Sequence, residues 1–159
     1  MKIAQIMLAK DFGGAERSFV DICEVLQGMG HEVIAICETR SKARHILKNK
    51  NIRYFPVNVL SSWDPFALRT MKNILAEEQP QVVQAHLARG AKFVGKIANK
   101  LKIPSLVKTH NYINLKYYQH VHQLVPTTVD QENYLLASGV EAGRITRIPN
   151  FTRMPLVSA

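Results

Sequence analysis

Two adjacent glycines, Gly13 and Gly14, stand between a short apolar run and the first amphipathic segment, in the stretch LAKDFGGAERSF. Glycine has no Cβ, so backbone N–H groups in such a loop can come close to a ligand. The start of a helix adds partial positive charge, which favours an anion. The loop therefore indicates an anion-binding site, and a tight turn that binds nothing is the alternative.

Further polar residues follow other apolar runs. His86 ends the run QPQVVQAH, and the residues KTHN, 108–111, end the run that begins at IPSLV. In an open parallel sheet, ligands bind beyond the carboxyl ends of the strands. We therefore expect four strand-end segments to share one cleft: residues 9–15, 86–90, 109–118 and 127–129.

Several other kinds of site lack their residue patterns. No carboxylate pair flanks a candidate sugar site, no G-x-S-x-G stretch occurs, and no G-K-[ST] follows the glycines. The six histidines have no metal-ligand spacing, since His120 and His122 are two apart without a third ligand nearby. The sequence therefore predicts neither a metal site nor a bound cofactor.

A dinucleotide-binding oxidoreductase is the nearest functional competitor. Its loop reads G-x-G-x-x-G, with an acid about 20 residues further on. Glu38 stands at a suitable place for that acid, but the third glycine is absent. Glu16 and Arg17 also fill positions where that loop packs closely. This interpretation stays open as the less favoured one.

The elements that must position these residues alternate along the chain. Apolar runs predict strands over 2–8, 32–37, 52–57, 79–86, 103–110, 123–128 and 144–150. Helical periodicity predicts helices from Gly14 to Gly30 and over 41–50, 63–79, 88–101 and 129–139. Asp64 before Pro65 is typical of a helix start, and Gly30 and Gly139 are typical of helix ends. The alternation predicts an α/β fold, a Rossmann-like parallel sheet in three α/β/α layers.

The charge of the chain favours anionic partners. Its 159 residues, one domain of ordinary globular composition, carry 21 basic and 12 acidic side chains, a net charge of +9. Nucleic acid is disfavoured, since no helix-turn-helix, zinc or RNP pattern occurs. A basic cluster occupies 39–53, and Arg89, Lys92, Lys96 and Lys100 share one helix face that could hold an anionic membrane surface. A solvated outer face is the alternative.

The location of the protein is suggested by what the sequence lacks. No stretch has the pattern of a signal peptide or the length of a membrane helix. Cys23 and Cys37 lie in apolar runs without a disulfide framework, which predicts buried thiols in a reducing compartment. We therefore expect a cytoplasmic protein, with peripheral attachment to the inner face of the membrane as an option.

An ordered set of motifs resembles those of family 4 glycosyltransferases, which have the GT-B fold. GGAERSFVDICEVLQGMGHEV is similar to the family's first loop and helix, and QPQVVQAHLARG to its fourth strand. IPSLVKTHN and VPTTVDQENYLLASGVEAGRITRIPN are similar to its later strands. The resemblance covers nearly the whole chain, although Phe151 stands where the family usually has glycine.

The resemblance implies retaining, metal-independent transfer of a sugar from a nucleotide-sugar donor to a glycan or lipid-linked acceptor of the cell envelope. It implies that residues 1–150 form the N-terminal, acceptor-side domain and that 151–159 begin the linker. A C-terminal donor-binding domain would then be absent from this chain, which should be inactive by itself. The alternative is a non-catalytic subunit, or a sugar- or phosphate-binding domain, of a split transferase.

The resemblance also implies residue roles. The amides of Gly13 and Gly14 would face the donor diphosphate, His110 would contact the donor sugar as the catalytic candidate, and His86 matches the fourth-strand histidine. A histidine bonded to backbone is the alternative for His110, and a structural role is the alternative for His86. The other candidates for the cleft or the acceptor are Glu16, Arg17, Arg89, Lys108, Thr109, Asn111 and Tyr112.

Several of these other candidates also have structural alternatives. Glu16 could serve only the first helical turn, where a carboxylate is favoured, and Arg17 could pair with it. Lys108 fits an edge-facing charge better than a contact to an acceptor phosphate. The tyrosine-rich segment 111–120 could form an acceptor wall, since aromatic faces suit sugar rings, or it could pack as an ordinary loop.

Overall fold

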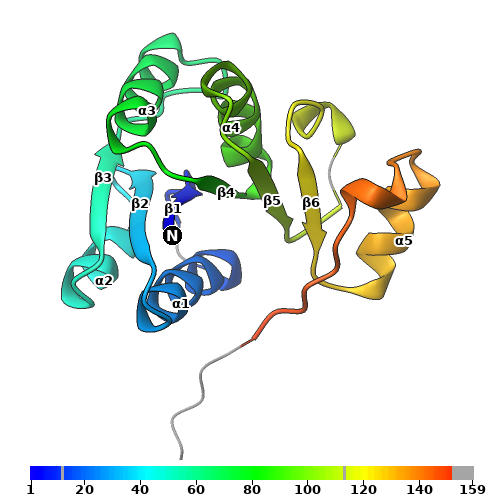
Figure 1. The fold of residues 1–159 in the computed structure, drawn as a ribbon, viewed down its shortest axis with the longest axis horizontal. Helices are drawn as coiled ribbons and strands as arrows, with labels where there is room; N and C mark the ends of the chain where they lie inside the picture. Colours follow the sequence, from blue (N-terminus) through cyan, green and yellow to red (C-terminus); the bar gives the residue numbers. More distant parts are fainter. Residues whose placement is uncertain (12, 113, 152–159) are drawn as a thin grey trace, which may run out of the picture.

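A single parallel sheet forms the centre of the molecule. The computed structural model describes residues 1–11, 13–112 and 114–151. Its six strands are β1 (Lys2–Met7), β2 (Glu32–Glu38), β3 (Arg53–Val57), β4 (Val82–His86), β5 (Ser105–Thr109) and β6 (Gln123–Pro126). They are all parallel, in the order β3-β2-β1-β4-β5-β6 (Figure 1). The reversal of strand order beside β1 is that of a Rossmann-like sheet, as predicted.

Helices cover both faces of this sheet. The helices α1 (Gly14–Gly28) and α2 (Ala43–Asn49) lie on one face, and α3 (Pro65–Glu78) and α4 (Leu87–Leu101) on the other (Figure 1). The helix α5 (Val129–Ala137) lies beside the edge strand β6, and the short 3₁₀ helices η1 (Leu115–Tyr117) and η2 (Ala142–Arg144) flank it in sequence. The three-layer arrangement is the predicted one.

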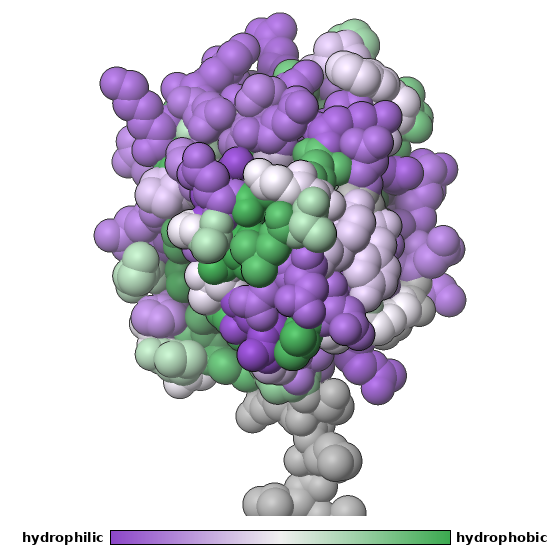
Figure 2. Space-filling model, turned by 90° about the vertical axis from the view of Figure 1, so that its right-hand side faces the viewer, coloured by the Kyte–Doolittle hydropathy of each residue, from purple (hydrophilic) through white to green (hydrophobic). Residues whose placement is uncertain are grey.

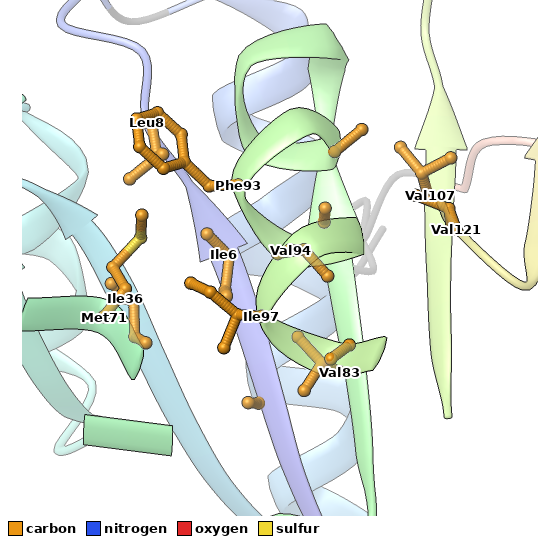
Figure 3. Packing of buried hydrophobic residues seen from close by; sticks show 14 of the residues in the cluster. Ile6, Leu8, Ile36, Met71, Val83, Phe93, Val94, Ile97, Val107 and Val121 are labelled. Carbon is orange, nitrogen blue, oxygen red and sulfur yellow. The ribbon is translucent and has the colours of Figure 1, made fainter. Parts of the chain in front are cut away.

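Two hydrophobic cores, one on each face, hold the layers together. Ile6 and Ile36 of the sheet pack against Met71 of α3 and Ile97 of α4 (Figure 3). The core on the other face includes Met7, Phe19, Leu47 and the two cysteines. Both cysteines are fully buried, which confirms the predicted burial of the thiols, and burial raises the pKa of the Cys37 thiol to about 12. Because both faces of the strands are covered, their sequences are nearly continuous apolar runs.

The predicted helix boundaries follow local chemistry. Asp64 Oδ1 accepts hydrogen bonds of 3.0 Å from the N–H groups of Phe66 and Ala67, which caps α3. Gly30 and Gly139 have φ of +85°, the left-handed conformation that ends a helix. These three predictions are confirmed.

The predicted strand over 144–150 is wrong. This segment runs beside β6, and Thr146 and Ile148 donate their N–H groups to the carbonyls of Leu124 and Pro126 at 3.0 Å. Between these two segments, all of whose residues the structure describes, a single bridge forms, between Leu124 and Ile145. A parallel ladder needs an N–H at position 126 to bond back to the other segment, and Pro126 has none. The ladder therefore stops after one bridge.

The surface on the β6 side is largely hydrophilic, with a hydrophobic area near its centre and further apolar side chains below it (Figure 2). In the part of the chain that the structure describes, no helix has the length and apolar character needed to cross a membrane.

Candidate functional site

A cleft of about 350 Å³ lies at the carboxyl edge of the sheet, where β1 and β4 end. It combines three of the four predicted strand-end segments: Leu8, Ala9, Lys10, Asp11, His86, Leu87, Ala88, Arg89 and Asn111 line it. The fourth segment, 127–129, does not contribute. Its Thr127 instead bonds the side chain of Gln131, which fixes the start of α5.

His86 is held rigidly behind this cleft. It is the last residue of β4 and directly precedes α4, with no loop between them. Leu87 makes this reversal with φ of +62°, a strained conformation for a branched side chain. The imidazole of His86 is fully buried, and its ring meets Phe19 of α1 edge to face, with centroids 5.4 Å apart.

The His86 ring makes two polar contacts, one on each nitrogen. Its Nδ1 lies 3.3 Å from Nε2 of His110, and its Nε2 lies 3.0 Å from Oε1 of Gln5. Gln5 in turn donates from Nε2 to Oε1 of Gln84 at 3.2 Å. The structure therefore brings the two predicted histidines together and joins them to two glutamines in the sheet.

Both histidines are neutral at pH 7. Burial lowers the pKa of His86 well below its usual range, and the charges of His110 and Lys108 lower it further. Burial, and then the charge of Lys108, lower the pKa of His110 to about 4. Each ring therefore offers one donor and one acceptor nitrogen.

Lys108 is not the edge-facing charge that the sequence favoured. It lies on the interior strand β5, directly beside His86 in register, and is only 2% exposed. Among the described residues its ammonium has no carboxylate or hydrogen-bond acceptor, and it lies 5.8 Å from the ring centroid of Phe151. Burial lowers the pKa of this ammonium. The Lys108 side chain is enclosed and its ammonium has no anionic partner among the described residues, so it is suited to receive a negatively charged group.

The N–H groups of Gly13 and Gly14 differ in their hydrogen bonding. Gly13 donates its N–H to Oε2 of Glu16 at 2.7 Å, so this amide is bonded within its own helix start. A Cβ on Gly13 would lie 3.3 Å from that oxygen, whereas a Cβ on Gly14 would meet no atom within 4 Å. Gly14 is the first residue of α1, so its N–H has no acceptor within the helix. Neither glycine is among the residues that line the cleft. Glu16 serves the helix start, and Arg17 is exposed and forms no ion pair with it within the described ranges.

The remaining candidates divide between the cleft and the scaffold. Arg89 donates from Nη1 to the carbonyl of Leu8 at 3.3 Å, which places its guanidinium at the cleft. Thr109 is buried, and its hydroxyl donates to the carbonyl of Val125 at 3.5 Å, so it joins two strands.

The described tyrosines of the segment 111–120 are not among the residues that line this cleft. Tyr112 is 58% exposed and meets Tyr134 of α5 edge to face, with centroids 5.3 Å apart. Tyr118 is buried in the hydrophobic core. For these two residues loop packing is what the structure shows.

The residues that a dinucleotide site or a metal site would need are not available at this cleft among the described residues. The carboxylate of Glu38 is fully buried and accepts from the backbone N–H of Arg40 at 2.5 Å and from its guanidinium at 3.2 Å, so it is not free for a ribose. Within residues 1–11, 13–112 and 114–151, no three His, Cys, Asp or Glu side chains gather as metal ligands would.

Sequence reasoning missed Gln5 and Gln84 as parts of this site. Each is a single polar residue inside an otherwise apolar strand run, and they are paired in register on β1 and β4. A buried amide needs hydrogen-bond partners, so these two positions were the available signal.

The match to a family model decides the classification. The model for Glycosyltransferase Family 4 matches residues 12–153. The chain belongs to this family. Lipopolysaccharide core biosynthesis glycosyltransferase LpsD of Rhizobium meliloti is 30% identical over 154 residues, which are 96% of this chain and 44% of LpsD.

Solved structures show the same fold. The crystal structure of Anabaena Alr3699/HepE in complex with UDP matches with a TM-score of 0.79 at 13% identity, over 94% of this chain and 44% of that one. The apo form of the lipopolysaccharide outer core galactosyltransferase WaaB matches with a TM-score of 0.74 at 16% identity, over 99% and 48%. The family 4 chain therefore has the fold of part of a GT-B glycosyltransferase and spans less than half the length of these relatives.

Proposed function

We propose that this chain is the N-terminal, acceptor-side domain of a retaining glycosyltransferase that moves a sugar from a nucleotide-sugar to a glycan or lipid-linked acceptor. The observation that carries the proposal is the joining of the two strand-end histidines, beside a buried cation, at the carboxyl edge of a family 4 fold. LpsD and WaaB are by name lipopolysaccharide core enzymes, and HepE was crystallised with UDP and with UDP-glucose, which supports an envelope glycan and a nucleotide-sugar.

The residues of the site suit departure of a diphosphate from a sugar. Negative charge that develops on the leaving group can be stabilised by fixed N–H dipoles and cations. Gly14 has an N–H at the helix start without an acceptor in the helix, and Lys108 has an ammonium without a carboxylate partner among the described residues. His110, being neutral, can hydrogen-bond a sugar hydroxyl, and Arg89 can hold an anionic group of the acceptor in the cleft. No metal is required by this set.

The test separates the two substrates. Saturation-transfer NMR on the 159-residue chain should detect a lipopolysaccharide core oligosaccharide and should give a weak signal or none with UDP-glucose, because we place the donor mainly on a second domain. Comparing the NMR signals of the His110→Ala and Arg89→Ala variants with those of wild type should show which of the two side chains contacts each ligand. Turnover of any sugar nucleotide by the chain alone would contradict the need for a second domain. Stable co-purification of a separate donor-binding chain would favour the split-transferase alternative.

A second part of the proposal concerns an anionic membrane at the cytoplasmic face. Leu60, Trp63 and Phe66 are 76%, 73% and 81% exposed, within seven residues of one another at the start of α3. Lys92 and Lys96 of α4 place their ammonium groups 3.1 Å and 5.1 Å from the Trp63 ring centroid. Below, these three apolar side chains and two lysines are called the α3 tip.

The α3 tip has the composition of a surface that lies on a lipid headgroup layer. Aromatic side chains insert among the headgroups, and lysines attract anionic lipid by about 1 kcal/mol each. Lys96 and Lys100 continue along the neighbouring groove with Lys72. Arg89 differs from the rest of the predicted basic face, because it lies at the cleft.

A further inference from the structure

The polar side chains of the site form one chain of contacts on a single face of the sheet. Gln5 and Gln84 are partners in register on β1 and β4, and His86 lies two residues beyond Gln84 on the same face. From Gln84 the contacts run to Gln5, to His86 and to His110, over 3.2, 3.0 and 3.3 Å. Gln5 and His86 are fully buried. A buried polar network of this kind is stable only when each group finds its partner.

The direction of these hydrogen bonds follows from the amide of Gln5. Because Gln5 donates from Nε2 to Gln84, its Oε1 faces His86 as an acceptor. The Nε2 of His86 must then carry the proton, and in a neutral ring Nδ1 is left as an acceptor. The contact to His110 is satisfied only if Nε2 of His110 carries a proton as well. His110 then has its free lone pair on Nδ1.

We propose that Gln5 and Gln84 are positioning residues that, through His86, fix His110 as the Nε2–H tautomer, so that its Nδ1 accepts a hydrogen bond from a hydroxyl of the bound sugar. The inference rests on the proposed function for the identity of the ligand, but the tautomer itself does not. Its basis is the directed series of contacts that starts at two amides in the middle of the sheet.

A fixed tautomer gives the site a chemical preference. A neutral Nδ1 accepts from a hydroxyl but repels the lone pairs of a carbonyl or carboxylate oxygen. The site would therefore distinguish a sugar hydroxyl from an oxidised or missing one, and leaving a buried polar group unpaired is what makes such discrimination large. Lys108 lies beside His86 in register and takes no part in the chain of contacts, so it remains available for a negative group of the same ligand.

The test reads the tautomer directly. Long-range ¹H–¹⁵N NMR of the labelled 159-residue chain separates protonated from bare ring nitrogens, and we expect His110 to be mainly the Nε2–H form. Gln5→Met removes the acceptor at nearly the same size, and His110 should become a mixture of tautomers. Gln123→Met is the matched control, since Gln123 bonds Thr146 away from this network.

The outcomes are distinct. A wild-type His110 protonated on Nδ1, or a tautomer that Gln5→Met leaves unchanged, would overturn the inference. If Gln5→Met does not fold, Gln84→Met at the partly exposed end of the chain of contacts serves instead, because it frees the Gln5 amide to turn over. In a chimera with the remaining part of LpsD, Gln5→Met should lower kcat/KM roughly 10- to 100-fold, as loss of a supporting hydrogen bond does at metal sites. A changed tautomer with unchanged turnover would count against the role of His110 in transfer and not against the network.

Discussion

At the scale of single residues, burial of the His86 and His110 imidazoles makes the stability of the folded chain depend on pH. Unfolded histidine has a pKa near 6.5, whereas burial holds the pKa of His110 at about 4 and that of His86 well below normal. Below pH 6.5 the unfolded chain therefore binds protons that the folded chain does not. The free energy of unfolding should fall as the pH drops from 6.5 towards 4, by at most about 1.4 kcal/mol per pH unit for each ring.

This pH dependence can be assigned by substitution. Urea denaturation of His110→Gln between pH 7 and 4 should give a flatter fall than wild type, because one titrating group is removed. His45→Gln removes an exposed histidine on α2 and should leave the slope as it is. Equal slopes for wild type and His110→Gln would mean that His110 titrates normally in the folded state.

The enclosed ammonium of Lys108 should lower the stability of the folded chain. Replacing a buried charge that has no partner by an apolar side chain of similar length removes a desolvation cost, so Lys108→Met should raise the free energy of unfolding by about 1 kcal/mol. The pKa of His110 should rise at the same time, since Lys108 lowers it. Lys100→Met, on the exposed side of α4, should change neither quantity much. A less stable Lys108→Met chain with an unchanged His110 pKa would contradict both arguments.

At the scale of elements, α4 is positioned by a glycine. A Cβ on Gly95 would lie 2.9 Å from Cβ of His120 and 3.0 Å from its carbonyl carbon, so the helix can approach the loop after η1 only without a side chain there. Gly95→Ala should lower the free energy of unfolding by about 1–3 kcal/mol, the usual effect of overpacking.

Gly28, at the end of α1, is the matched control for Gly95. A Cβ there would meet no atom within 4 Å, and its φ lies outside the left-handed region. Gly28→Ala should therefore leave the chain as stable as before or stabilise it by up to about 1 kcal/mol. Thermal unfolding of the two variants side by side measures the difference, and equal melting temperatures would rule out the close approach at Gly95.

The elements were largely predictable because their signals are local. Alternating apolar runs, Asp64 with Pro65, and the glycines at 30 and 139 depend on neighbours in sequence. The predicted strand over 144–150 failed because its pairing depends on Pro126 in another element, which lacks the returning N–H. Contacts between elements could not be predicted for the same reason. Nothing near Lys108 in sequence indicates that β4 and β6 lie on either side of it.

The same distinction applies to the site. The glycine loop, His86 and His110 were identifiable because the motif and the strand end mark them. Gln5 was not, since one amide in a strand has no periodic signature until its partners on β4 are known. The difference between the Gly13 amide, which is bonded to Glu16, and the Gly14 amide, which has no acceptor in the helix, also required the geometry of the first helical turn.

At the scale of the whole molecule, the proposed membrane contact combines the positive charge with the apolar α3 tip. In this proposal the net charge of +9 attracts the chain to anionic lipid, and the exposed apolar side chains of the α3 tip insert among the headgroups. Burying one large apolar side chain contributes about 1.5–3 kcal/mol, so Trp63→Ser should weaken binding to vesicles of anionic lipid at least about tenfold. Met29→Ser, which changes an equally exposed apolar residue at the end of α1, should have little effect.

The charges of the α3 tip should contribute separately. Lys92→Glu with Lys96→Glu should weaken flotation with anionic vesicles by at least about tenfold, and the loss should diminish at high salt, where electrostatic attraction is screened. Reversing Lys42 and Lys48 in the basic cluster over 39–53 tests the competing surface on the α2 side. If binding survives the α3-tip substitutions but not those at Lys42 and Lys48, the membrane contact lies on the opposite face of the sheet. Binding that ignores salt and all of these substitutions would remove it altogether.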